Sequence, residues 1–208
     1  MSYQDLIKQL EQLGTLKTPR IISVFKKVDR ADFMLPEDRK FAGADTAFSI
    51  GSGQTISQPT TVAFMLEKLQ PQKGDKVLDI GSGSSWTTAL LAKIVGPEGK
   101  VWGIEINPAI YKFGQNNLQK LNLPNIELKL ADASGGWPAK APFDRILAGA
   151  ASGKISQVLK KQLKIGGRLV VPVQDTIISL ERKSQSKFCR QIFPFFAFVP
   201  MRGKYGQK

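Results

Sequence analysis

A turn rich in glycine and serine stands between two apolar segments of the chain. The sequence KVLDI (76–80) runs into GSGSS (81–85), and an apolar stretch of helical character follows. In a strand–turn–helix unit, Gly81 permits the tight change of direction, and Gly83 lets the backbone approach a ligand without a side chain in the way. Glu105 ends the next apolar segment, where a carboxylate can accept hydrogen bonds from both ribose hydroxyls of an adenosine. Together these features predict a site for a cofactor that contains a nucleoside.

The residues around this turn favour S-adenosylmethionine over a dinucleotide. A dinucleotide site requires the pattern GxGxxG, whereas Trp86 occupies the sixth position here. Asp79, just before the turn, can approach the positively charged methionine end of S-adenosylmethionine. Asp132 follows the third apolar segment and can accept a hydrogen bond from the adenine amino group, with the capping of a turn or helix as its alternative role. We therefore expect S-adenosylmethionine as the cofactor.

These residues need a framework of strands and helices to bring them together. After Pro71–Gly74, short apolar segments alternate with helical ones, which is typical of βαβ units and a mostly parallel sheet. The expected strands are 76–80, 100–105, 126–131, 143–149, 168–173, 175–182 and 188–199, the last two forming an antiparallel edge pair. The expected helices are 85–95, 108–121 and 155–163. The predicted fold class is therefore α/β, with a doubly wound, Rossmann-like, mostly parallel seven-stranded sheet.

The N-terminal third of the chain has a different, more helical pattern. Residues 3–13 show helical spacing, and Thr18–Pro19 opens a second helix in which we expect Ile22, Phe25 and Val28 to face inward. The remaining expectations here are an irregular loop over 41–57 and a helix over 59–69. We expect one domain over 1–208, made of an N-terminal helical extension on the substrate side (1–70) and a cofactor-binding core (71–208).

The composition restricts the chemistry that is available. The 208 residues include no histidine, which excludes Ser–His–Asp catalysis, most zinc sites and the commonest general base, so no metal site is expected. The single cysteine, Cys189, cannot form an internal disulfide and is expected to be a structural thiol. No apolar run approaches the roughly 20 residues that span a bilayer. The N-terminus does not resemble a signal peptide, so a cytoplasmic location is expected.

The chain is strongly basic, with a formal net charge of +13. A surplus of this size can attract nucleic acid, acidic proteins or membrane surfaces. The lysines are scattered, however, and the densest clusters, at 160–164 and 182–187, are short and lack interleaved aromatic residues. We therefore expect a solvated basic surface rather than a dedicated nucleic-acid groove, and no membrane partner.

Several ordered motifs resemble one family, the protein-L-isoaspartate (D-aspartate) O-methyltransferases, over about residues 30–201. The most specific is IGSGQTISQP (50–59), upstream of the cofactor turn, where that family has its GQTIS-P signature. The other segments that match are RADFM (30–34), VLDIGSGSSWTTALLA (77–92), GWPAKAPFDRIL (136–147), QLKIGGRLVVPV (162–173) and FVPM (198–201). The resemblance implies transfer of a methyl group from S-adenosylmethionine to the free α-carboxylate of isoaspartyl residues in damaged proteins. Separately, we expect the protein to be a monomer.

The resemblance also assigns roles to residues. It implies that Ser57 is the catalytic hydroxyl, although without the family context capping of the helix ahead of Pro59 would be its favoured role. The expected substrate-binding residues are Gln54, Thr55, Gly149 and Ala150. The expected cofactor-binding residues are Asp79, Gly81, Ser82, Gly83, Ser85, Trp86, Glu105, Ile106, Asp132 and Ala133.

The chain departs from the usual family pattern at three places. Ser85 and Trp86 stand where the family loop has glycine and tyrosine, Gly149 stands in the place of a threonine, and FAGADTAFS (41–49) lacks the usual tyrosine-x-aspartate pattern. Two alternatives therefore stay open beside isoaspartyl repair. One is a methyltransferase that acts on RNA or another macromolecule, and the other is a relative that binds the cofactor without catalysis.

Overall fold

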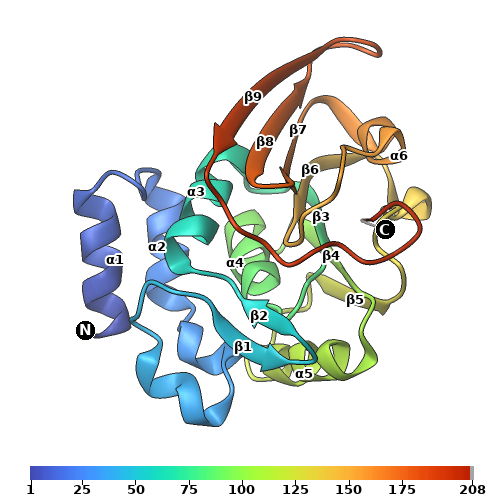
Figure 1. The fold of residues 1–208 in the computed structure, drawn as a ribbon. Coiled ribbons are helices and arrows are strands. Elements are labelled where there is room, and N and C mark those ends of the chain that lie inside the picture. The colour runs from blue at the N-terminus through green and yellow to red at the C-terminus, as the bar shows by residue number, and fades with distance from the viewer. Residues whose placement is uncertain (207–208) are drawn as a thin grey trace.

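The computed structural model describes residues 1–206, and its centre is a seven-stranded sheet in the order β5-β4-β3-β6-β7-β8-β9 (Figure 1). The five strands from β5 to β7 run parallel, and β8 and β9 are added antiparallel at one edge. The strands are β3 (Lys76–Ile80), β4 (Lys100–Glu105), β5 (Ile126–Leu130), β6 (Phe143–Ala148), β7 (Leu163–Val173), β8 (Thr176–Arg182) and β9 (Phe188–Pro194). The predicted fold class is confirmed, including the antiparallel pair at the edge.

Both faces of the central strands are buried, and alternate residues along β3 enter different cores, whereas the edge strands β5 and β9 are partly exposed. Val77 of β3 packs with helices α1 to α5 on one face, whereas Leu78 and Ile80 pack on the other face with α6 and the C-terminal Met201. The helices of the core are α3 (Pro59–Leu69), α4 (Trp86–Val95), α5 (Pro108–Gln119) and α6 (Gln157–Lys161). Mostly apolar residues along the central strands therefore produce a layered arrangement, with helices on both faces of these strands.

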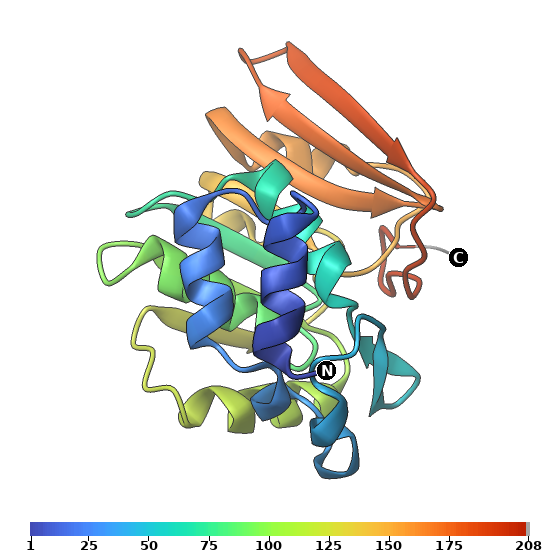
Figure 2. The same ribbon diagram turned by 90° about the vertical axis from the view of Figure 1, so that its left-hand side faces the viewer.

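The N-terminal extension packs against α4 rather than against the sheet itself (Figure 2). It consists of α1 (Tyr3–Gln12), α2 (Pro19–Lys27) and the short 3-10 helices η1 (Arg30–Phe33) and η2 (Pro36–Phe41). Reciprocal hydrogen bonds between Ser2 and Asp5 cap the start of α1. Phe25 and Val28 are fully buried and Ile22 is half-buried against the same core, as predicted, and the structure adds Ile21 to the buried side of α2.

Several predicted segments differ in the structure. The strand expected over 168–173 already begins at Leu163 as β7, because Leu163 pairs with Phe143, and the strand expected over 188–199 ends at Pro194 as β9, because Phe195 adopts a left-handed conformation. The expected irregular loop over 41–57 contains a hairpin of β1 (Phe48–Gly51) and β2 (Gln54–Ile56), because Ser52 and Gly53 adopt the left-handed conformations of a tight turn. The helix expected over 155–163 is only α6, because Leu163 already belongs to β7 and pairs with Phe143. A last short 3-10 helix, η3 (Pro138–Lys140), precedes β6. Within residues 1–206, no helix combines the length and apolar character that crossing a membrane requires.

Candidate active site

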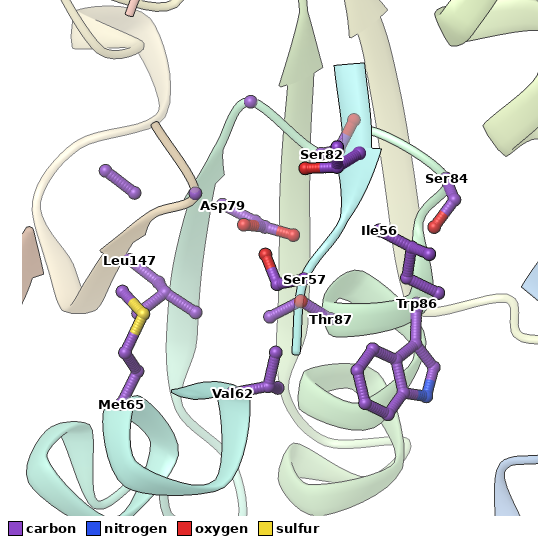
Figure 3. Close-up of a pocket in the computed structure, with 14 residues that line it drawn as sticks. Ile56, Ser57, Val62, Met65, Asp79, Ser82, Ser84, Trp86, Thr87 and Leu147 are labelled. Atoms are coloured by element: carbon purple, nitrogen blue, oxygen red, sulfur yellow. The ribbon is translucent and has the colours of Figure 1, made fainter. Parts of the chain in front are cut away.

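A continuous cleft opens at the carboxyl ends of β3, β4 and β6, which is where ligands bind in open α/β sheets. One part has an empty volume of about 520 Å³ and is lined by Ser57 and Asp79, whose side chains point into the same space (Figure 3). The adjoining part, about 610 Å³, is lined by Glu105. Both parts share Thr55 and Gly149 in their walls, so the hairpin β1–β2 and the end of β6 face the cofactor turn across one cavity.

The cofactor turn is fastened to the neighbouring strand by its backbone. The N–H groups of Gly81 and Ser82 both donate to the carbonyl oxygen of Ile104, at 2.9 and 3.0 Å. Gly81 has φ +73° and Gly83 has φ +55°, a region that side chains with a Cβ rarely adopt. Ser85 shares this conformation at φ +68°, directly before α4. The turn therefore brings Gly81 and Ser82 to the wall of the cavity, whereas Gly83 and Ser85, also predicted to contact the cofactor, are not among its lining residues.

Glu105 is held rigidly at the end of β4. Its side chain is 6 % exposed and accepts three backbone hydrogen bonds, from Gly83 at 3.1 Å, Ile106 at 2.8 Å and Asn107 at 2.9 Å. A carboxylate has about four lone-pair positions, so acceptor capacity remains on the side that faces the cavity. The structure thus orients this acid in advance for a ligand that presents hydroxyl donors.

Asp79 is a buried carboxyl group whose negative charge lacks a partner. Among residues 1–206, its carboxyl group accepts one side-chain hydrogen bond, from the hydroxyl of Thr88 at 2.6 Å. Burial raises the pKa of Asp79 from its ordinary value of 3.8 to about 6, the hydrogen bond from Thr88 opposes this change, and the negative charge of Glu105 adds to it. Among residues 1–206, no lysine or arginine forms an ion pair with Asp79. A bound cation in the cavity would therefore be stabilised there.

Ser57 lies opposite Asp79 and is available to a second ligand. The N-cap of α3 is Gln58, so the alternative in which Ser57 caps this helix is wrong. In the described part of the chain the Ser57 hydroxyl forms no hydrogen bond, and it lines both the cofactor cavity and a neighbouring groove along residues 195–199. The hydroxyl can therefore bind a group that enters from the groove toward the cofactor.

Arg30 is a residue of this site that sequence reasoning missed. It is fully buried, and its guanidinium donates to the carbonyl oxygens of Ala42, Ala44, Thr46 and Ser57 at 2.6 to 3.2 Å. Burial lowers its pKa to about 10, so the group stays charged at neutral pH. The RADFM motif was the signal, but only the structure shows that its arginine holds both ends of the segment that carries the hairpin.

The two unusual residues of the turn have buried side chains. Trp86 borders the cavity, but its indole packs edge-to-face against Tyr3 and Phe25, with ring centroids 6.4 and 5.8 Å apart, and the side chain is 1 % exposed. The hydroxyl of Ser85 points under the turn, where a side chain at Gly114 would meet it. The substitutions relative to the usual family loop therefore change the support of the turn and its contact with the N-terminal helices.

Asp132 has a different environment from the one that we predicted. Its carboxylate accepts hydrogen bonds from the backbone of Ser134 and of Lys204, both at 2.8 Å, and it does not line the cavity, whereas Ala133 does. Partial burial opposes ionisation, but these hydrogen bonds lower the pKa of Asp132 below its ordinary value. The alternative role as a turn cap fits this geometry, and the bond to Lys204 requires the fold because the partners are distant in sequence.

The remaining predicted residues lie around the same cleft. Gln54, Ile106 and Ala150 line the part that contains Glu105, and Ser82 lines the part that contains Asp79. The structure adds wall residues that sequence reasoning did not assign, namely Ile56, Val62, Met65, Ile80, Ser84, Thr87, Asn107, Leu147, Ala148, Val199, Pro200, Met201 and Arg202. Among residues 1–206, no group of three acidic, cysteine or histidine side chains is placed to bind a metal.

Known proteins are similar in sequence to nearly the whole of this chain. A protein-L-isoaspartate O-methyltransferase of Ignicoccus hospitalis is 36 % identical over 203 residues, covering 95 % of this chain and 96 % of the relative. The enzyme of the same name from Methanopyrus kandleri is 37 % identical, covering 98 % and 92 %.

Solved structures share the fold. A protein-L-isoaspartate O-methyltransferase from Plasmodium falciparum, in complex with S-adenosyl-L-homocysteine, has a TM-score of 0.87 at 20 % identity and covers 97 % of this chain and 99 % of its own. A second protein-L-isoaspartate O-methyltransferase has a TM-score of 0.88 at 23 % identity, covering 99 % of this chain and 67 % of its own. The family defined as protein-L-isoaspartate(D-aspartate) O-methyltransferase matches residues 1–206, and this chain belongs to that family.

Proposed function

We propose that this protein transfers a methyl group from S-adenosylmethionine to the α-carboxylate of L-isoaspartyl residues in damaged proteins. One observation carries the proposal. A single continuous cleft is lined by the buried carboxyl group of Asp79, by the carboxylate of Glu105, and by the hydroxyl of Ser57, which also faces an open groove. The first two features suit the cofactor, and the third suits an acceptor that enters on a polypeptide. The membership of the family points to the same reaction.

The residues present fit S-adenosylmethionine. Asp79 would offset the positive charge of its methionine end, because this buried carboxylate has no cationic partner from residues 1–206. Glu105 would accept from the ribose hydroxyls, since three backbone N–H groups already fix its orientation. Gly81 would let the backbone lie against the ligand, because glycine has no side chain and so also adopts its φ of +73° without strain. When bound, S-adenosylmethionine supplies a methyl group on a positively charged sulfur.

The acceptor side needs no general base. A carboxylate is already ionised at neutral pH, so one of its oxygens can form the new bond to the methyl carbon while the carbon–sulfur bond breaks. The products are a methyl ester and S-adenosylhomocysteine, and no proton has to move. Ser57 would donate its hydroxyl hydrogen to the other oxygen and so orient the acceptor. Gln54 and Thr55, on the same hairpin, would bind the substrate backbone, and Arg30 would keep Ser57 in place through its carbonyl oxygen.

The direct test compares acceptors with labelled S-adenosylmethionine. The proposal predicts methylation of a peptide that contains one L-isoaspartyl residue and none above background for its aspartyl twin of identical sequence. Bulk tRNA is the third acceptor, since the net charge of +13 favours nucleic acid as the alternative partner. Equal labelling of the two peptides, or labelling of tRNA alone, would refute the repair function. Absence of cofactor binding by calorimetry would refute any methyltransferase activity.

We also propose that one chain is the complete catalytic unit. The residues assigned to the cofactor and to the acceptor all come from the same chain and line one continuous cleft. Sedimentation of the active protein at assay concentration tests this statement. A dimer that loses activity when diluted to monomers would contradict it.

A further inference from the structure

Two basic clusters that are separate in the sequence come together in the structure. The basic residues of 160–164 lie at the end of α6 and the start of β7, and those of 182–187 lie where β8 turns into β9. The guanidinium of Arg182 joins the clusters, because it donates to the carbonyl oxygen of Leu163 as well as to those of Ser184 and Gln185. The six cationic residues of this surface, called the basic ridge below, are Lys160, Lys161, Lys164, Arg182, Lys183 and Lys187.

An aromatic ring lies between the two clusters. Phe188, the first residue of β9, is half-buried. The ammonium of Lys160 lies 5.7 Å from the centroid of its ring, and the guanidinium of Arg182 lies 6.0 Å from it. These cation–π contacts hold cations of both clusters against one ring. The clusters are therefore short and free of aromatic residues only along the sequence, and the folded chain combines them into one larger surface.

Much of the positive charge of the basic ridge is not neutralised. Within residues 1–206, the acids that form ion pairs with the ridge are Asp144 and Glu181, at 2.7 and 2.5 Å. Lys160, Lys161 and Lys187 form no ion pair with any described residue. Lys161 and Lys187 are also exposed, so their charges face the solvent. A surplus of this kind attracts a polyanion.

The basic ridge lies at the opposite end of the sheet from the cofactor cleft. The cleft opens at the carboxyl ends of β3, β4 and β6, whereas the ridge includes the amino end of β7 and the adjoining turn between β8 and β9. In Figure 1 this turn is at the top of the molecule, away from the C-terminal segment that borders the cleft. A partner bound to the ridge therefore leaves the cleft open to an acceptor.

We propose that the basic ridge binds the phosphate backbone of a nucleic acid duplex, without sequence preference and outside the active site. A duplex carries one negative charge for about 1.7 Å of its axis, and lysines bind phosphates as point charges without reading the bases. The ring of Phe188 already contacts two cations, so it supports the ridge rather than serving as a platform for an unpaired base. The duplex is a docking partner and not a methyl acceptor, and its binding holds the open cleft near other proteins on the same nucleic acid.

The experiment compares two triple variants of the full chain that lose the same charge. The ridge variant replaces the three ridge lysines that have no ion pair, Lys160→Gln, Lys161→Gln and Lys187→Gln. The control replaces three exposed lysines of the helices α2, α4 and α5, which pack on the other side of the sheet, Lys27→Gln, Lys93→Gln and Lys120→Gln. Fluorescence anisotropy measures the Kd for a labelled DNA duplex, and for an RNA duplex of the same sequence, between about 50 and 200 mM salt.

We expect the Kd of the ridge variant to rise about 10- to 100-fold, and the Kd of the control to stay near the wild-type value. The slope of log Kd against log salt should become shallower by about 3 in the ridge variant, since each lost phosphate contact removes about 0.9 from it. A triple variant with arginine at the three ridge positions should bind as the wild type does, and so should a duplex of scrambled sequence. Urea unfolding of each variant confirms that the fold is intact.

Several results would overturn the inference. One is a wild type that does not bind the duplex, or equal weakening in the ridge variant and the control. Another is competition by poly-glutamate, or by vesicles of phosphatidylserine and phosphatidylcholine, that matches unlabelled duplex at equal negative charge, because the ridge would then serve a different class of partner. Methylation of the duplex itself would show that it enters the cleft.

The isoaspartyl peptide assay separates this inference from the proposed function. The ridge variant should methylate the short peptide at the wild-type rate, because the ridge and the cleft lie at opposite ends of the sheet. Failure of the wild type to methylate the peptide refutes the proposed function and leaves duplex binding as a separate measurement. A peptide rate that falls in the ridge variant but not in the control would contradict the separation of the two surfaces.

Discussion

Asp79 offers a sharp test, because the structure predicts opposite effects on stability and on cofactor binding from one substitution. The carboxyl group is 2 % exposed, receives one hydrogen bond from Thr88 and has no cationic partner in residues 1–206. Its charge is therefore costly to the ligand-free fold and useful only when a cation binds. Asp79→Asn keeps the shape and an acceptor for Thr88 while it removes the charge.

The pKa of Asp79 gives the size of the effect on stability. Burial raises it from 3.8 to about 6, so the native state binds the proton more tightly than the unfolded chain does. Between these two values the native state carries more protons, and the free energy of unfolding therefore falls as the pH rises from about 4 to about 6. At 1.36 kcal/mol for each pKa unit, the upper limit is about 3 kcal/mol at pH 7.5.

The variant should therefore be more stable than the wild type at pH 7.5 by up to about 3 kcal/mol, and the advantage should largely disappear at pH 4. Urea unfolding at the two pH values, without cofactor, measures both differences. Binding should change in the other direction: the loss of a charge-assisted contact of about 1.5–3 kcal/mol predicts a Kd for S-adenosylmethionine about 10- to 100-fold higher. Calorimetry at pH 7.5 measures this.

Two results would refute the reasoning about Asp79. The first is a stability gain of Asp79→Asn over the wild type that is no larger at pH 7.5 than at pH 4. This result would show that burial does not penalise the charge of Asp79. Unchanged affinity for S-adenosylmethionine would show that the charge does not face the cofactor. Thr88→Val provides a related control, because removal of its hydrogen bond should raise the pKa of Asp79 further and move the pH-dependent loss of stability upward.

Three further substitutions test other parts of the site. Ser57→Ala removes the hydroxyl proposed to orient the acceptor, so kcat should fall about 10- to 100-fold while calorimetric affinity for S-adenosylmethionine stays near the wild-type value; an equal loss of affinity would place Ser57 in the cofactor site instead. Glu105→Gln puts an amide against three backbone N–H donors, so the Kd for S-adenosylmethionine should rise about 10- to 100-fold; normal binding would contradict its role. Arg30→Met leaves four carbonyl oxygens without their donor, so peptide turnover should fall while cofactor affinity stays nearly normal. Arg30→Lys should recover part of the lost turnover. Equal activity of the two variants would show that the charge of Arg30 and its hydrogen bonds do not position Ser57.

Local patterns were sufficient for the central strands and for most of the helices near them. The segments 76–80 and 100–105 became β3 and β4 with the predicted bounds, because a strand buried on both faces needs a short, mostly apolar run. The glycines of the turn were equally informative, since few other residues adopt their backbone conformation. The motif around Ser57 pointed to the substrate side through resemblance, and the structure brings that residue to the cofactor cavity.

Patterns were less informative where the structure depends on distant partners. The hairpin β1–β2 lies in a stretch of glycine, serine and alanine with weak strand character, and its strands form because they pair with each other. The end of α6 could not be located because Leu163 pairs with Phe143 on the neighbouring strand. Both cases involve contacts that a local window of sequence does not contain.

By itself, the sequence determined the type of sheet, the position of the cofactor turn and the acid at the end of β4, because these follow from short-range rules of backbone conformation and burial. Only the tertiary structure decided what the side chains around the turn touch. Trp86 packs on the N-terminal helices, Arg30 holds the segment of Ser57, and Asp132 accepts a hydrogen bond from the backbone of Lys204. The physical reason is that a buried polar or aromatic group takes whichever partner the fold brings within contact distance, and those partners are far away in the chain.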